Sequence, residues 1–128
     1  MIFQRTGPES TQGLPSRASL FPLAGMFVAW TTVPTKVIAD TLAASAVHAR
    51  LAVCVQVDGP ITSHYVWEGM QAKIEEYRLT FKVLPEQVKP LETWLQSRHP
   101  YQIHEWFVVK VSHVAEKYLS WAQASPNS

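Results

Sequence analysis

The chain of 128 residues has few of the features that mark several common protein classes. It contains a single Cys, so no disulfide can form within the chain, which excludes a small secreted module held together by disulfides. Its longest apolar run is far shorter than the roughly 20 residues needed to span a bilayer. The 11 basic and 10 acidic residues give a formal net charge of +1, which excludes polyanion binding by bulk electrostatics. What remains is a chain of single-domain size that is 47% hydrophobic, so we expect one folded domain.

The two ends of the chain differ in composition from the middle. Residues 1–24 contain many Gly, Pro and Ser residues without a helical or strand period, which predicts a flexible N-terminal extension. A transit peptide is the alternative interpretation, but Glu9 and the lack of a clear amphipathic helix argue against it. Residues 124–128 are expected to form a short tail, which leaves residues 25–123 as the folded domain.

The hydrophobic periodicity of this domain predicts two successive strand–helix–strand units followed by a further helix. The expected strands are 26–32, 51–57, 61–67, 77–83 and 103–111, and the expected helices are 35–48, 87–98 and 114–122. Turns are expected at Asp58-Gly59-Pro60 and at Glu68-Gly69. Pro90 requires that the second helix either begins near Gln87 or is kinked. Two interleaved βαβ units predict a ferredoxin-like α+β sandwich with an extra C-terminal helix.

Several ordered blocks resemble the signature motifs of the CutA family of divalent-cation tolerance proteins. The blocks are Ser-His-Tyr-Val-Trp-Glu-Gly at 63–69, His-Pro-Tyr-Gln-Ile-His-Glu at 99–105 and Tyr-Leu-Ser-Trp at 118–121, with Thr-Thr-Val-Pro at 31–34 and Leu-Ala-Val-Cys-Val at 51–55. The resemblance covers residues 26 to 122. It implies a homotrimer of ferredoxin-like subunits, in which long hairpins pair across subunits and leave clefts between them. It also implies metal tolerance and copper binding, with no established catalytic reaction.

The chain departs from the family pattern at positions that bear on metal binding. The family's Gly-Lys-Ile is Gly69-Met70-Gln71 here, and of the acidic residues that follow only Glu75 and Glu76 remain. His104 stands where a Pro is usual in the family. Thr31, Trp94 and Arg98 occupy positions at which some members carry proposed copper ligands. Copper ligands of those members therefore have no counterpart at these three positions.

Three residues are candidates for a metal site, because copper prefers thiolate, thioether and imidazole ligands. Cys54 is the only thiol, and its alternative interpretation is a small packed hydrophobe on a strand. His99 precedes Pro100 at a helix end, where the alternative is a cap or a packing imidazole. His64 lies in the hairpin implied by the resemblance, where a three-fold axis would triple any ligand near it. His104 and Glu105 are expected on opposite faces of a strand and so cannot chelate one ion together.

Aromatic and charged residues in or beside the matching blocks are candidates to line an intersubunit cleft. They are Tyr65, Trp67, Glu68, Lys82, Tyr101, Glu105, Tyr118 and Trp121. Five Trp residues are many for this length, and a single sandwich cannot easily bury so many rings of roughly 150–250 Å² each. Trp30 and Trp106 lie on expected strands whose alternate residues already fill the core. The excess of Trp therefore predicts contacts between subunits.

Two other uses of the ferredoxin-like scaffold do not fit this sequence. Residues 32–36 lack the Arg-bearing phosphate loop of acylphosphatases, and residues 77–83 lack the aromatic motif with which RNA-recognition domains stack bases. No Gly-x-Ser-x-Gly motif or phosphate-binding glycine loop is present. We therefore expect a non-enzymatic, cytoplasmic homotrimer that binds copper or another divalent cation, with no organic cofactor, nucleic acid or membrane partner. The alternative is a PII-like signalling or scaffold trimer that binds a small molecule in its intersubunit cleft.

Overall fold

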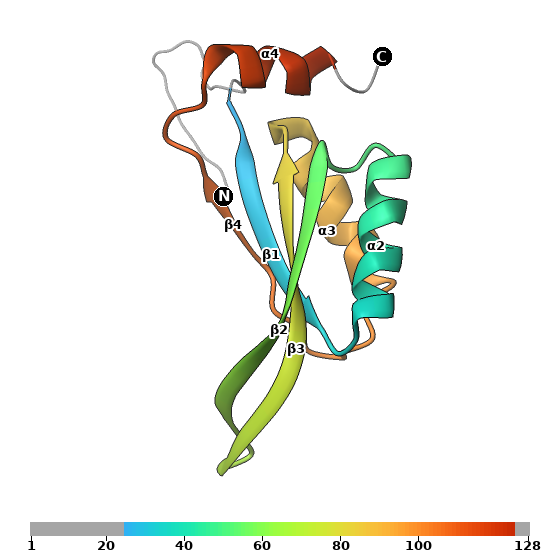
Figure 1. The fold of residues 1–128 in the computed structure, drawn as a ribbon, viewed down its shortest axis with the longest axis vertical. Helices are drawn as coiled ribbons and strands as arrows, with labels where there is room; N and C mark the ends of the chain where they lie inside the picture. Colours follow the sequence, from blue (N-terminus) through green and yellow to red (C-terminus); the bar gives the residue numbers. More distant parts are fainter. Residues whose placement is uncertain (1–24, 125–128) are drawn as a thin grey trace.

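The computed structural model describes residues 25–124, which form one antiparallel sheet and three α-helices. The elements in chain order are β1 (Phe27–Val33), α2 (Lys36–His48), β2 (Cys54–Trp67), β3 (Met70–Val83), the 3-10 turn η1 (Pro85–Gln87), α3 (Val88–Gln96), β4 (Phe107–Lys110) and α4 (Glu116–Ala124). The sheet order is β2-β3-β1-β4, which confirms the predicted ferredoxin-like topology with an extra C-terminal helix (Figure 1). The expected extension 1–24 lies outside the described residues. Ala124, assigned to the tail, is instead the last residue of α4, as suits the strongest helix former.

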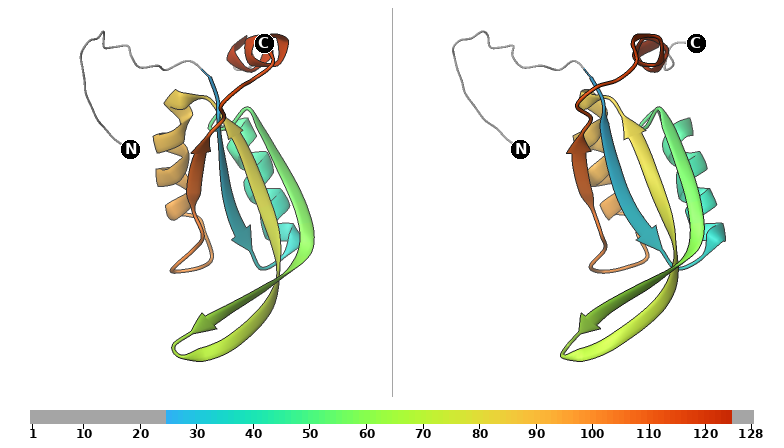
Figure 2. Two further views of the ribbon diagram at one scale, coloured as in Figure 1. Left: turned by 90° about the vertical axis from the view of Figure 1, so that its left-hand side faces the viewer. Right: turned by 60° about the vertical axis from the view of Figure 1, so that its left-hand side comes forward.

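Both crossover helices lie on one face of the sheet, and α4 lies across its end (Figures 1 and 2). Among the described residues no helix covers the opposite face, which we call the open face (Figure 2). Nor does any helix within residues 25–124 have the length and apolar character needed to span a membrane. One sheet therefore has a covered face and an open face within a single chain.

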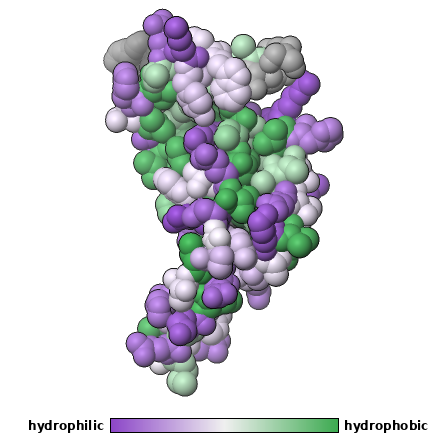
Figure 3. Space-filling model, in the orientation of Figure 1, coloured by the Kyte–Doolittle hydropathy of each residue, from purple (hydrophilic) through white to green (hydrophobic). Residues whose placement is uncertain are grey.

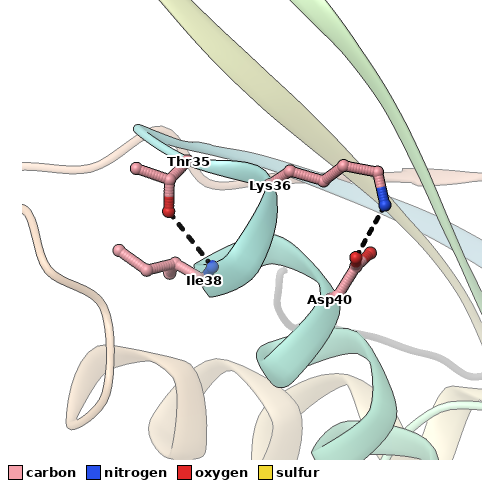
Figure 4. A network of polar contacts seen from close by, with 4 residues as sticks. All are labelled: Thr35, Lys36, Ile38 and Asp40. Atoms are coloured by element: carbon pink, nitrogen blue, oxygen red, sulfur yellow. Dashed lines mark hydrogen bonds and ion pairs between the residues drawn. The ribbon is translucent and has the colours of Figure 1, made fainter.

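Local sequence signals explain where α2 begins and how it packs. Thr35 is the N-cap, and its hydroxyl accepts a hydrogen bond of 3.2 Å from the Ile38 N–H (Figure 4). Lys36 donates to the Asp40 carboxylate at 2.7 Å one turn later on the exposed side (Figure 4). The residues that α2 buries against the sheet recur at helical spacing and are Ala39, Leu42 and Ala46.

The second crossover helix resolves the difficulty posed by Pro90. Because α3 begins at Val88, Pro90 lies in the first turn, where backbone N–H groups have no acceptor within the helix. The first of the two predicted alternatives is thus confirmed. The Gln87 side chain fixes the preceding turn, since it accepts from the Leu84 N–H at 2.8 Å and donates to the Arg50 carbonyl at 2.9 Å.

The main core lies between the covered face and the two crossover helices. Its fully buried side chains include Leu79 and Phe81 from the centre of the sheet and Leu91 and Leu95 from α3. Trp106 packs against this core, with its ring 5.9 Å from that of Phe81 in an edge-on arrangement. The assignment of Trp106 to subunit contacts is therefore wrong, because this residue points to the covered side. A second, smaller cluster joins α4 to the end of the sheet through Met26, Val53, Leu84 and Ala122.

The predicted turn at residues 58–60 is wrong, because β2 runs through it as one strand. Asp58 is paired with Arg78, whereas Ile61 is paired with Glu76, so β2 contains one extra residue at this point. A single extra residue in a strand reverses which face each later side chain occupies. Gly59 is required here, since a Cβ at this position would lie 2.6 Å from the Tyr77 ring. The residues that resemble a turn therefore form a β-bulge.

Beyond the bulge, the two longest strands form an arm that projects from the body of the molecule (Figure 1). This hairpin arm comprises residues 61–76 and closes at the predicted turn Glu68-Gly69, where both residues have positive φ. On the face shown in Figure 3 the arm is mainly polar, whereas apolar residues gather over the body. The expected strand 103–111 is shorter than predicted, since β4 begins at Phe107 and Ile103 lies exposed in the connecting loop 97–106.

Candidate functional site

A cleft of about 560 Å³ lies between the hairpin arm and the connecting loop. It is lined by Thr32, Tyr65, Trp67, Ile74, Glu76, Pro100, Tyr101, Gln102, Ile103 and Glu105. Because of the bulge, Tyr65 and Trp67 lie on the same face of the arm as Ile74 and Glu76. The structure thus brings four of the predicted cleft residues together, namely Tyr65, Trp67, Tyr101 and Glu105.

Glu76 is the buried acidic residue of this cleft, with 7% of its surface exposed. Its two carboxyl oxygens accept hydrogen bonds from the Ser63 hydroxyl at 2.7 Å and from the Tyr101 hydroxyl at 2.8 Å. Each carboxyl oxygen of Glu76 thus has one hydrogen-bond donor. Burial raises the pKa of Tyr101 far above its usual value, and the bond to Glu76 raises it further, so this phenol stays protonated and donates.

Glu105 brings a second carboxylate to the cleft from the connecting loop. Glu105 is exposed at the surface, but partial desolvation by its surroundings raises its pKa, and repulsion by Glu76 raises it further, while Arg78 opposes both effects. Arg78 itself is engaged by Asp58, to which it donates from Nε at 3.2 Å and from a terminal nitrogen at 2.8 Å. Within residues 25–124 no cation forms an ion pair with either glutamate. The two carboxyl groups of the cleft therefore have no ion-pair partner within the described chain.

His99 holds the connecting loop against β1. Its Nδ1 accepts a hydrogen bond of 3.0 Å from the Tyr101 N–H, so the ring proton is assigned to Nε2. Nε2 lies 2.9 Å from the Thr32 carbonyl and 3.0 Å from the Thr31 hydroxyl, which in turn donates to the Glu105 carbonyl at 2.7 Å. Burial, followed by the neighbouring His104, lowers the pKa of His99 to about 4. A neutral His99 thus positions both Tyr101 and Glu105.

His104 extends this arrangement as a second imidazole. The rings of His99 and His104 stack with their centroids 4.3 Å apart and their planes 11° apart. His104 Nδ1 is buried without a hydrogen-bond partner. A positive charge on His99 would face this second imidazole, which adds to the effect of burial in favouring the neutral form of His99.

The comparison with known proteins identifies the family. The family model described as CutA1 divalent ion tolerance protein matches residues 27–125. The chain belongs to this family. The divalent-cation tolerance protein CutA of Yersinia pestis (strain Pestoides F) is 37% identical over 94 residues, which cover 73% of this chain and 79% of that protein.

Solved structures of CutA proteins have the same fold. CutA from Synechococcus elongatus PCC7942 is 40% identical and superimposes with a TM-score of 0.76 over 80% of this chain and 90% of that one. The structure of the same protein complexed with a Bis-Tris molecule gives 39% identity and a TM-score of 0.73 over 80% of this chain and 94% of that one. The resemblance derived from the sequence blocks is confirmed.

In this CutA1-family chain the three candidate metal ligands do not meet. Cys54 is partly buried against the second cluster, which is the alternative interpretation of that residue. His64 is exposed on the arm, and both ring nitrogens of His99 are used in hydrogen bonds. His104 and Glu105 lie in a loop, so the prediction from strand alternation is wrong for them. Among residues 25–124 no group of three or more His, Cys, Asp or Glu side chains is placed to hold a metal ion.

The remaining predicted cleft residues lie elsewhere in the subunit. Lys82 is at the far end of β3 from the arm, with its Nζ 5.9 Å from the centre of the Tyr118 ring. Tyr118 packs beside Trp121 at 5.5 Å, and Glu68 is in the turn of the arm. A single chain does not bring these two groups of residues together, because strands of 14 residues separate them. Contact between these groups across subunits stays a prediction.

Sequence reasoning does not identify the residues that organise the cleft. In the sequence Glu76 is only a remnant of an acidic hairpin, and Ser63 and Thr32 are only parts of matching blocks. The signal that would find them is the extra residue at the Gly59-Pro60 bulge. Once the alternation of β2 is reversed there, Ser63 and Glu76 are expected on one face of the arm.

Proposed function

We propose that this CutA1-family protein contributes to the tolerance of divalent cations as a non-enzymatic homotrimer. The family match across the whole described domain is the observation that carries this proposal. The open face supports assembly, since the contacting rings of Trp30 and Phe107 and the neighbouring Val109 leave an apolar surface that no helix of the described chain covers. Monomeric proteins rarely leave such surfaces uncovered. A cytoplasmic location is part of the same proposal.

A copper or other divalent ion would be held between copies of the chain. Within residues 25–124 a single copy groups fewer than three ligands, so a complete site needs residues from neighbours. His64 is the best candidate, because it is exposed on the projecting arm and a three-fold axis would supply three imidazoles. Cys54 is the second candidate, since its thiol is only partly buried.

Light scattering followed by titration with Cu²⁺ tests this proposal in two steps. We expect a particle three times the mass of the 14.4 kDa chain and stoichiometric Cu²⁺ binding measured by calorimetry. His64→Ala should abolish that binding, whereas His48→Ala, which alters an exposed His at the end of α2, should leave it unchanged. A stable monomer would refute the trimer, and Cu²⁺ binding that is insensitive to His64→Ala and Cys54→Ala would refute the site.

A small-molecule sensor of the PII-like type is the second candidate function. The cleft between the arm and the connecting loop favours it, because its volume of about 560 Å³ is in the range of small-ligand sites. The relative from Synechococcus elongatus was solved complexed with a Bis-Tris molecule, which is an organic amine. In this proposal metal binding is incidental and the cleft is the binding element.

A further inference from the structure

We propose that the cleft binds an organic ammonium ion, held between two carboxylates and a wall of aromatic rings. The carboxylates are those of Glu76 and Glu105, and the rings are those of Tyr65, Trp67 and Tyr101. The inference rests on the small-molecule function proposed above and assigns the chemical class of its ligand. Anions are excluded from this site by the same two carboxylates.

The charge of the cleft calls for a cation. Glu76 is more than nine-tenths buried, with one hydrogen bond on each carboxyl oxygen, and each oxygen keeps a lone pair for a further donor. Arg78, which lines the adjoining hollow, uses two of its N–H groups on Asp58. A buried carboxylate without a cationic partner is unfavourable, so a cation that enters the cleft gains a strong charge-assisted interaction.

The second carboxylate strengthens this argument. The bond between the Glu105 carbonyl and the Thr31 hydroxyl holds Glu105 in the lining of the same cleft as Glu76, and repulsion by Glu76 raises the pKa of Glu105. A positive charge placed between them removes this repulsion. Within a single described chain, no cationic side chain forms an ion pair with either glutamate, so a ligand cation would complete the charge balance.

The size and walls of the cleft select an organic cation over a bare metal ion. A volume of about 560 Å³ is far larger than a single ion needs, and no third ligand of the described residues joins the two carboxylates. Tyr65 and Trp67 are 43% and 52% exposed, so their rings are free to contact a ligand. Aromatic rings attract ammonium groups, and most strongly when the cation carries alkyl groups that replace its water.

Calorimetric titration of the full-length protein with choline chloride tests the inference. Choline is a quaternary ammonium, so its charge does not change with pH. Dimethylbutanol, its uncharged carbon analogue, is the matched control, and sodium acetate tests the opposite charge. We expect choline to bind at least about tenfold more tightly than dimethylbutanol, since one charge-assisted contact contributes about that factor. Equal affinity for the two compounds would overturn the assignment of a cation site.

Two neighbouring glutamates of β3 provide a matched pair of variants. Glu76 faces the cleft, whereas Glu75 is exposed and faces the other side of the arm. Glu76→Gln and Glu105→Gln should each weaken choline binding about tenfold, while Glu75→Gln leaves it unchanged. Glu105 is exposed, so its variant reports on binding even if Glu76→Gln does not fold. Choline affinity that is unaffected by Glu105→Gln would overturn the proposal.

The controls separate this inference from the broader proposals. Trp67→Leu keeps an apolar side chain in the arm and should also weaken choline binding, because it removes an aromatic wall. A trimer that binds Cu²⁺ but not choline would refute the ammonium site and leave the metal-tolerance function standing. Binding of acetate in place of choline would refute the ligand class and leave a small-molecule cleft standing.

Discussion

The two faces of one sheet differ in how far a single chain completes them. On the covered face Phe81 is fully buried between β3 and the crossover helices, whereas on the open face Phe107 of β4 is 50% exposed beside Trp30. Both side chains belong to the same four-stranded sheet and to the same residue type. The covered face is therefore stable without partners, and the open face still has apolar surface to bury.

The two faces also differ in the kind of residue that they carry. The covered face is almost entirely apolar, and its residues serve the core. The open face and the arm carry Glu76, Arg78 and the aromatic rings of the cleft. The residues that we propose to bind ligands or other copies are thus on the side that the crossover helices leave uncovered.

Phe81→Ala and Phe107→Ala make the same chemical change on the two faces, and Phe81→Ala should have the largest effect. It removes a fully buried ring that also contacts Trp106, so we expect the free energy of unfolding to fall by about 3–5 kcal/mol. Urea denaturation followed by circular dichroism measures this loss. A loss below about 1 kcal/mol would show that the core repacks around the cavity.

Phe107→Ala should instead act on assembly. The ring is half exposed in one chain, so its removal has a smaller effect on the folding of that chain than loss of a buried ring. If copies cover the open face, the variant loses contacts made only in the trimer, and light scattering at falling protein concentration should detect dissociation earlier than in the wild type. Equal concentration dependence in the wild type and the variant would contradict an interface at this face.

The covered face was the part that could be predicted from the sequence. Its residues alternate along the strands and recur at helical spacing, as with Leu79 and Phe81 on β3 and Leu42 and Ala46 on α2. Such periods arise because one face of each element is buried by local neighbours. Pro90 left two alternatives, a helix that begins near Gln87 or a kinked helix, and α3 follows the first.

The cleft could be predicted only in part. Its aromatic rings lie in recognisable blocks, but the pairing of Glu76 with Ser63 depends on the bulge, and composition alone made Gly59-Pro60 resemble a turn. The hydrogen bond that joins His99 to Thr32 connects residues 67 positions apart, which no local period reports. Contacts that are distant in sequence and made by single side chains need the structure.

His99 connects the loop that lines the cleft to β1 of the sheet. It should make the free energy of unfolding depend on pH. Its pKa is lowered from 6.5 to about 4 in the folded protein, so the unfolded chain binds the proton more readily. Stability present above pH 6.5 should therefore decline as the pH falls toward 4. A tenfold difference in proton affinity between the folded and unfolded states corresponds to about 1.4 kcal/mol. Because the ring is partly exposed, solvent screening makes the effect smaller than the full pKa difference would give. We therefore expect His99 to contribute about 1–2 kcal/mol to the free energy of unfolding.

Urea denaturation across this pH range, compared with His99→Gln, measures the contribution. The groups that face His99 are His104 and Tyr101 in its own loop, Glu76 on β3, and the uncharged Thr31 and Thr32 on β1. Because the other titrating groups remain in the variant, the difference between the two pH profiles isolates His99. His48→Gln is the matched control on α2. Parallel profiles for the wild type and His99→Gln would contradict the arrangement.

The smallest effects on stability are expected when either of two exposed ion pairs is broken. Asp40→Asn breaks the pair with Lys36 on α2, and Asp58→Asn breaks the pair with Arg78 beside the cleft. Both pairs are solvated, so each variant should lose less than about 1 kcal/mol in urea denaturation. Only Asp58→Asn releases a cation near the cleft, because Arg78 and Glu105 line the same adjoining hollow of about 550 Å³.

Released Arg78 would move toward Glu105 and compete with a ligand cation for it. We therefore expect choline affinity to fall by about twofold to fivefold in Asp58→Asn and to be unchanged in Asp40→Asn, an effect of less than about 1 kcal/mol. Added salt should reduce this difference, since the new pair is partly exposed. Equal choline affinity in the two variants would mean that Arg78 stays in place without Asp58. In that case the negative charge of the cleft is set by the two glutamates alone.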